Sequence, residues 1–119
     1  MFAGGRRVDN LIATVDVNGR QIDGDTDQVL PLGDLHAKWA AFGWEVRSME
    51  GNDMHAVLAG LAEAKGLTGQ GKPVCILMRT EMGMGVDFMM GSHEWHGIAP
   101  NDEQLARALA QLPNGTEDF

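Results

Sequence analysis

The chain has 119 residues, 44% of them hydrophobic, and a formal net charge of −8, which is the size and composition of one folded domain rather than of a disordered segment. Nine Lys and Arg residues against seventeen Asp and Glu residues cannot easily build a basic face, so we expect no nucleic-acid partner and no membrane partner. The sequence has no apolar run of membrane-spanning length and no signal-peptide core, and its single cysteine fits a reducing compartment, so we predict a cytoplasmic protein.

The first half of the chain predicts two strands with a helix between them. Residues 1–10 are expected to form the last turn of a helix, and the apolar run at 11–17 predicts a strand buried on both faces, as central parallel strands are. Asp34 is placed to cap a helix that ends at Gly43. Residues 44–49 then alternate apolar and polar side chains, the pattern of a half-exposed edge strand.

The clearest helix begins at Asn52 or Asp53 and ends at Gly66. We expect it to bury one apolar stripe against a sheet: Met54, Val57, Leu58 and Leu61. A second fully apolar strand follows at 74–78 and holds Cys75 as a buried small hydrophobe. Strands that alternate with helices imply parallel pairing with right-handed crossovers, so we predict an α/β fold, a three-layer αβα arrangement with a mainly parallel sheet.

The last third of the chain contains a long loop and one more helix. Residues 81–100 have no convincing periodicity, and a loop of that length is typically functional or disordered. The final helix begins at Asn101, which forms a capping box with Gln104, and its apolar stripe ends at Leu112. We therefore expect one domain over residues 1–112 and a tail or linker over residues 113–119.

Polar residues follow the first predicted strand directly, where ligands bind in open α/β sheets. Asp16 and Asn18 lead into the flexible loop 19–24, and the crevice beyond the carboxyl ends of the strands is the usual ligand position. The amide oxygen of Asn18 is a hard, neutral ligand suited to Mg²⁺ or Ca²⁺, and the loop exposes backbone carbonyls that could add a second oxygen. From the spacing alone, an ordinary turn is the more common use of these residues.

The second candidate site is the histidine pair in the stretch 91–97. Histidine can donate to a phosphate or move a proton near neutral pH, so His93 and His96 in a glycine-containing loop could form a site. The pair could equally be incidental on a surface loop. A zinc site lacks a third ligand at a recognisable spacing.

The segment 16–24, Asp-Val-Asn-Gly-Arg-Gln-Ile-Asp-Gly, resembles the closing half of the thiamine-diphosphate motif in the form found in the transketolase family. The resemblance implies that Asn18 binds Mg²⁺ (or Ca²⁺) through its side chain and Arg20 through its backbone carbonyl. It further implies that Ile22 contacts the thiazolium region of thiamine diphosphate, within a partial thiamine-diphosphate-binding fold.

A second part of the sequence is similar to the loop that closes over the cofactor in the same family. This part comprises Met82-Gly83-Met84-Gly85 and the pattern His-x-x-His-Gly-x-x-Pro at 93–100. The resemblance implies that His96 contacts the diphosphate and the reacting part of the sugar, as both a cofactor-binding and a catalytic residue. His93 is the secondary catalytic candidate. The methionines between 82 and 90 are expected to line an interface, because the family holds its cofactor between two domains or subunits.

Together these resemblances imply that the chain is the carboxyl-terminal part of the amino-terminal, diphosphate-binding domain of a transketolase, or of the amino-terminal subunit of a split one. The implied reaction moves a two-carbon ketol unit from a ketose phosphate to an aldose phosphate, as in the pentose phosphate pathway of carbohydrate metabolism. Implied partners are sugar phosphates and the remaining transketolase domains or subunit, in a dimeric assembly.

The opening Gly-Asp-Gly of the thiamine-diphosphate motif, which carries the charged metal ligand, is absent from the seventeen residues before Asn18. The activating glutamate and its aminopyrimidine-binding domain are absent as well, so we expect the isolated chain to be inactive. Two alternatives remain open from the sequence. One is a non-catalytic, truncated α/β module that associates with other subunits, and the other is a piece of a different thiamine-diphosphate enzyme.

Overall fold

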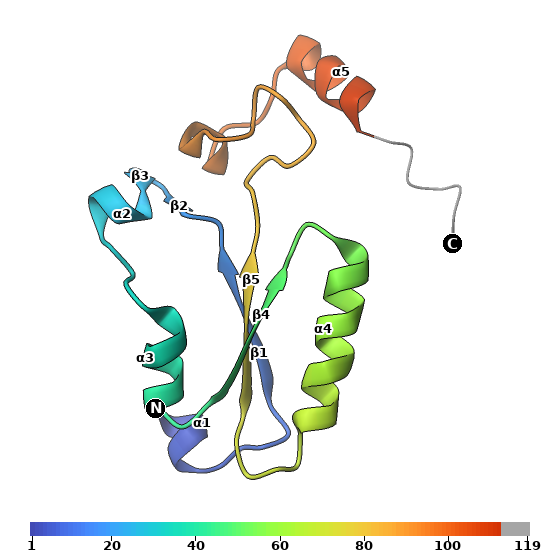
Figure 1. Ribbon diagram of the computed structural model, residues 1–119. Coiled ribbons are helices and arrows are strands. Elements are labelled where there is room, and N and C mark those ends of the chain that lie inside the picture. The colour runs from blue at the N-terminus through green and yellow to red at the C-terminus, as the bar shows by residue number, and fades with distance from the viewer. Residues whose placement is uncertain (113–119) are drawn as a thin grey trace.

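The fold is built on a three-stranded parallel sheet, seen in the computed structural model of residues 1–112 (Figure 1). The strand order is β1 (Ile12–Val17), β5 (Val74–Arg79), β4 (Glu45–Glu50), with β5 in the centre. Both neighbours pair with β5 in parallel, so that Ala13 and Val46 both lie opposite Cys75. Because β5 has a strand on each side and helices on both faces, its side chains from Val74 to Leu77 are at most 8% exposed.

Helices cover both faces of the sheet, which confirms the α/β fold with a parallel sheet between helices. On one face, α1 (Phe2–Gly5) and α3 (Leu35–Ala41) pack over a core that contains Trp44, Val46, Cys75 and Leu77. On the other face, α4 (Met54–Leu67) packs over Met49, Val74 and Ile76 through its fully buried Ala64. Two of the helices begin at the predicted caps: Asp34 accepts from the Ala37 N–H at 2.8 Å, and Asp53 from the His55 N–H at 2.9 Å.

The remaining elements lie beyond the carboxyl ends of the strands, at the top of Figure 1. They are the two-stranded ladder of β2 (Arg20–Gln21) and β3 (Gly24–Asp25), α2 (Thr26–Val29), the 3₁₀ helix η1 (His93–His96) and α5 (Asp102–Gln111). The predicted capping box of Asn101 and Gln104 at α5 is confirmed. The predicted tail at 113–119 lies outside the described residues.

The molecule is long and thin because these elements project past the sheet. Its radius of gyration is 17.3 Å and its extents are 51 × 40 × 17 Å, whereas a compact domain of this length has a radius of gyration of about 13.5 Å. Many large apolar side chains therefore stay exposed. Within residues 1–112, no helix has the length and apolar character needed to cross a membrane.

Two expectations about burial are wrong. The first strand, β1, is an edge strand with half-buried and exposed residues in alternation, because residues 1–112 give it a neighbouring strand on one side only. The apolar stripe predicted for α4 is mostly exposed, at 59% for Met54, 61% for Leu58 and 40% for Leu61. Within residues 1–112 the apolar side chains of α4 are therefore only partly covered.

Candidate functional site

The two predicted site segments start side by side at one edge of the sheet. Val17 at the end of β1 lies opposite Arg79 at the end of β5. Parallel pairing therefore brings the loop after residue 17 next to the loop after residue 79, although 62 positions separate them in the sequence. This is the crevice at which ligands bind in open parallel sheets.

Asn18 is held in a fixed orientation by the first of these loops. Its Oδ1 accepts a hydrogen bond from the Arg20 N–H at 2.8 Å, and its Nδ2 donates to Asp16 Oδ2 at 3.3 Å. The other Asp16 oxygen accepts from the Thr80 hydroxyl on the neighbouring loop. Asp16 therefore joins the two loops and orients Asn18, while Asn18 Oδ1 keeps a second lone pair for another partner.

Arg20 uses its side chain for the local fold. Its guanidinium is paired with the Asp25 carboxylate, and the two residues face each other across the β2–β3 ladder. The Arg20 backbone carbonyl takes no part in this ion pair. Next to it, Gln21 Nε2 is a buried donor for which residues 1–112 provide no hydrogen-bond partner, and such donors are rare unless a group from outside satisfies them.

The residues present fit a divalent cation only in part. Mg²⁺ takes about six oxygen ligands, and this chain offers two neutral ones, Asn18 Oδ1 and the Arg20 carbonyl. Within residues 1–112, no group of three or more His, Cys, Asp or Glu residues is arranged to hold a metal ion. A cation held at this loop would therefore need its negatively charged ligands from other groups.

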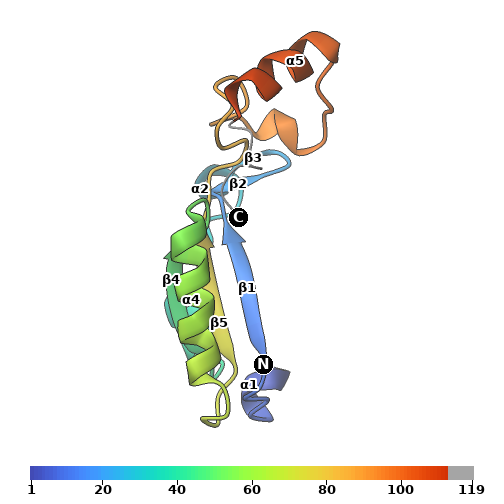
Figure 2. The same cartoon turned by 90° about the vertical axis from the view of Figure 1, so that its right-hand side faces the viewer.

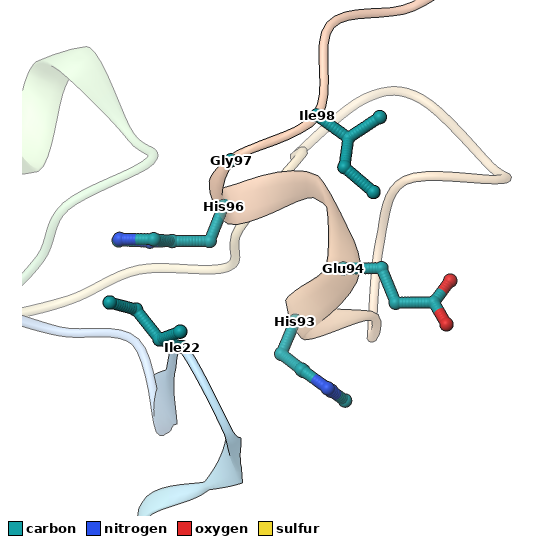
Figure 3. A pocket seen from close by; sticks show the side chains of 6 residues that line it. All are labelled: Ile22, His93, Glu94, His96, Gly97 and Ile98. Carbon is teal, nitrogen blue, oxygen red and sulfur yellow. The ribbon is translucent and has the colours of Figure 1, made fainter.

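The histidines lie across a pocket of about 420 Å³ from Ile22. The pocket is lined by the residues drawn in Figure 3: Ile22, His93, Glu94, His96, Gly97 and Ile98. In that view the His96 ring extends over the Ile22 side chain, whereas the Glu94 carboxylate points away. The structure thus brings together Ile22, His93 and His96. Asn18 and Arg20 do not line this pocket, but β2, which begins at Arg20, contacts η1.

The long loop before the histidines is ordered by specific contacts that the sequence analysis missed. Glu81 Oε1 accepts from the Gly91 N–H at 2.8 Å, and the Glu81 N–H donates to Asn52 Oδ1 at 2.6 Å. Trp95 Nε1 donates to the Phe88 carbonyl at 3.0 Å, and the two rings meet edge to face. These bonds depend on single polar atoms, so no periodic pattern could have revealed them.

α5 is attached to this loop through Asp87. The Asp87 N–H donates to Gln111 Oε1, and Gln111 Nε2 donates back to Asp87 Oδ1, both at 2.8 Å. The hydrogen bond from Gln111 holds the pKa of the Asp87 carboxyl below its usual value, with smaller help from the Phe88 N–H and from Arg107. The Arg107 guanidinium lies 4.8 Å from the centre of the Phe88 ring.

Comparison with known proteins shows which family this chain resembles. A family model described as "Transketolase, thiamine diphosphate binding domain" matches residues 1–118. A 6-deoxy-6-sulfo-D-fructose transketolase subunit of Clostridium sp. is 43% identical over 112 residues, which are 94% of this chain and 40% of that subunit. An apulose-4-phosphate transketolase subunit of Phocaeicola vulgatus is 33% identical, over 93% of this chain and 39% of that subunit.

The same likeness holds for solved structures. The crystal structure of transketolase from Campylobacter jejuni superposes with a TM-score of 0.83 at 30% sequence identity. The match covers 92% of this chain and 17% of the Campylobacter chain. The present chain therefore spans about 40% of the length of the curated subunits that it matches and a smaller share of full-length transketolases.

Proposed function

The chain belongs to the transketolase family, in its thiamine-diphosphate-binding domain, and from this premise we propose that it forms the carboxyl-terminal part of the surface that holds the cofactor's diphosphate. The observation that carries the proposal is the arrangement at the carboxyl edge of the sheet. Segments 16–24 and 93–98, more than 60 positions apart, meet around one pocket with Ile22 and His96 on facing sides. The activity we propose for the assembled enzyme is ketol transfer from a ketose phosphate to an aldose phosphate.

Asn18 and Arg20 serve the metal in this proposal. Asn18 Oδ1 and the Arg20 carbonyl supply two oxygens to Mg²⁺ (or Ca²⁺), and Asp16 acts as a positioning residue through its bond to Asn18. The unpartnered Gln21 Nε2 is a donor of the kind that an anionic oxygen needs. Bound thiamine diphosphate supplies the reactive carbon that carries the ketol unit, while the protein binds and orients it.

The histidines and Ile22 contact the cofactor and the sugar in this proposal. His96, which is exposed, donates to the diphosphate and moves a proton at the sugar, and His93 supports it as the second candidate. Ile22 is 68% exposed and presents an apolar surface to the thiazolium ring. An exposed isoleucine beside two histidines is explained by a ligand that covers it.

Other polypeptide completes the proposed enzyme. Two of the relatives are named as subunits of transketolases, and we propose that this chain likewise works in an assembly, dimeric and cytoplasmic, with the remaining transketolase domains or subunit. The described chain offers the metal only neutral oxygens. We therefore propose that the isolated chain is inactive and binds the cofactor weakly.

Calorimetric titration of thiamine diphosphate, with and without Mg²⁺, tests this assignment. The titration is made on the isolated chain and on the chain mixed with the part of the Clostridium subunit outside the match. We expect tight, Mg²⁺-dependent binding only in the mixture, and Asn18→Ala should weaken it by at least about tenfold, as loss of metal-site partners does. His96→Ala should weaken diphosphate binding in the mixture, and in the enzyme assembled with its aminopyrimidine-binding domain it should lower ketol transfer by about 10²–10⁴-fold.

Asn10→Ala is the matched control, because Asn10 is an exposed asparagine in a turn at the opposite end of β1. It should leave cofactor binding unchanged. Equal binding by the Asn18→Ala variant would contradict the metal assignment. A mixture that binds no thiamine diphosphate would favour the non-catalytic module.

A further inference from the structure

Two consecutive residues at the end of β5 are bonded to the two sides of the candidate site. The Thr80 hydroxyl donates to Asp16 Oδ1, in the loop that carries Asn18. Glu81 Oε1 accepts from the Gly91 N–H at 2.8 Å, and Gly91 lies two positions before η1 begins. One strand end is therefore attached to the Asn18 loop through Thr80 and to the histidine side through Glu81.

Glu81 is held at three points. Its N–H donates to Asn52 Oδ1 at 2.6 Å, and its carbonyl accepts from the Met84 N–H at 3.3 Å. Its carboxylate takes the Gly91 N–H. Because both backbone groups of Glu81 are bonded, the carboxylate reaches Gly91 from a defined position.

The turn between β4 and α4 anchors this strand end. The Gly51 N–H donates to the Arg79 carbonyl at 2.6 Å. A Cβ on Gly51 would collide with Thr80 Cγ2 and lie 3.1 Å from the Arg79 carbonyl oxygen, so glycine allows the turn to approach this closely. Asn52, the next residue, is thereby placed against the Glu81 N–H. The position of Glu81 thus depends on the sheet and on the start of α4.

The loop that carries η1 stands beyond the strand ends and continues from β5 (Figure 2). The bond to Gly91 fixes this loop just before η1, whose first and last residues are the two histidines. Trp95 Nε1 also holds η1, but it donates to the Phe88 carbonyl of the same long loop. Among residues 1–112, the Glu81 carboxylate supplies the side-chain hydrogen bond that joins the start of η1 to the end of β5.

We propose that Glu81 is a positioning residue for ketol transfer, which holds η1 so that His96 stays opposite Ile22 across the pocket. The inference rests on the function proposed above. Glu81 does not line the pocket and acts through the Gly91 N–H. Since Thr80 is bonded to the other side, the pair Thr80–Glu81 sets the separation of the two sides. A misplacement of about 1 Å can cost about a hundredfold in rate, so one bond at this point has a large effect.

The proposed role needs a hydrogen-bond acceptor rather than a charge. Within residues 1–112, Glu81 takes part in no ion pair, and the Gly91 N–H needs only an oxygen. Glutamine has the same length and an amide oxygen that accepts a hydrogen bond. Glu81→Gln should therefore preserve the bond that Glu81→Ala removes, which separates positioning from a general effect of charge.

The first test is NMR on the 119-residue chain without cofactor or metal. In Glu81→Ala, hydrogen exchange at the Gly91 amide should be at least about tenfold faster, as expected for loss of a bond to a charged acceptor. The ring resonances of His93 and His96 should shift. In Glu81→Gln, exchange should stay within about threefold of the unmodified chain, because a neutral bond remains. Glu103→Ala is the matched control, since it removes an exposed glutamate from α5 and should change neither observable.

The second test is ketol transfer by the chain assembled with the remaining transketolase domains, including the aminopyrimidine-binding domain. Glu81→Ala should lower kcat by about 10–100-fold. KM should change little, because Glu81 touches no substrate. Glu81→Gln should restore most of kcat, which a loss of general stability would not explain.

The proposal is overturned if Glu81→Ala leaves the Gly91 exchange rate or the histidine resonances unchanged. It is also overturned if Glu81→Gln loses as much as Glu81→Ala, or if kcat is the same in Glu81→Ala as in the unmodified enzyme. An unmodified assembly that transfers no ketol units would instead contradict the proposed function. The measurements on the isolated chain would still decide whether Glu81 holds the histidines in place.

Discussion

The sheet and the layer above its carboxyl edge are held together in different ways. Four consecutive residues of β5, from Val74 to Leu77, are at most 8% exposed and pack against helices on both faces. Among the described residues after 80, only Val86 and Ala108 are buried, and single hydrogen bonds position the rest. Burial supplies most folding free energy, so stability belongs to the sheet, whereas the site depends on a few polar contacts.

The largest difference in stability between the two regions should appear when an isoleucine is shortened to alanine in each. Ile76 is 1% exposed in the centre of β5, so Ile76→Ala should lower the free energy of unfolding by about 2–5 kcal/mol. Ile98 is 61% exposed beside the pocket, and Ile98→Ala should change the free energy of unfolding by less than about 0.5 kcal/mol. Urea unfolding followed by circular dichroism measures both. Similar losses in the two variants would show that the loop layer contributes to the core.

The second prediction tests how well the helices shield the centre of the sheet from solvent. Burial raises the pKa of the Cys75 thiol to about 11, against 9.0 for an ordinary thiol. At pH 8 the thiolate fraction in the folded chain should thus be about a hundredfold lower than in the unfolded chain. Labelling by a thiol reagent should be slower by at least that factor than in urea. The neutral thiol stabilises the fold below pH 9, and this contribution is lost as the pH rises towards 11.

The third prediction concerns the loop layer. Gly83 has φ of +71°, and a Cβ on it would lie 2.6 Å from Met89 Cβ and 2.8 Å from Met89 C. Gly83→Ala therefore adds a clash to a left-handed strain of about 1–2 kcal/mol. The loop should move, which would shift the Trp95 indole N–H resonance.

Gly91→Ala separates the clash from the strain. Gly91 has φ of +73°, but nothing lies within 4 Å of the position of its Cβ. This variant should therefore have the backbone strain without the clash. Its Trp95 indole N–H resonance should shift less than that of Gly83→Ala. An equal shift in the two variants would mean that the contact with Met89 does not hold the loop.

The same division explains how much of the molecule its sequence predicts. The strand at Val74, the caps at Asp34 and Asp53 and the capping box at Asn101 are local patterns, and each is confirmed. The position of β1 at an edge was missed, because the number of neighbours of a strand is not a local property. An apolar run predicts a central strand whether or not the strand has a second neighbour.

The meeting of the two loops was predictable for a different reason. Parallel pairing brings loops after β1 and β5 to one edge, and the resemblance placed Ile22 and His96 together, as they are found in the pocket. The joining of Asp16 to Thr80 and of Asp87 to Gln111 was not predictable. Each depends on two polar atoms far apart in sequence, and no spacing rule connects them.

The smallest effect is expected where α5 meets the loop. Gln111→Ala removes both hydrogen bonds to Asp87, so the lowered pKa of that carboxyl should rise towards its ordinary value of about 3.9. Because the folded-state pKa is lowered, the carboxylate stabilises the attachment of α5 above pH 4, and this contribution is lost as the pH falls through the lowered value. NMR titration of the Asp87 carboxyl carbon measures the change.

Glu103→Ala is the control on the same helix, since Glu103 is an exposed acid in its first turn. It should leave the Asp87 titration unchanged. If the pKa of Asp87 stays low in Gln111→Ala, the Phe88 N–H and Arg107 hold the carboxylate, and the side-chain bond to α5 is dispensable. If it rises as expected, the Gln111 amide is the group that keeps the pKa of Asp87 low where α5 meets the loop, whereas β5 is held by burial on both faces.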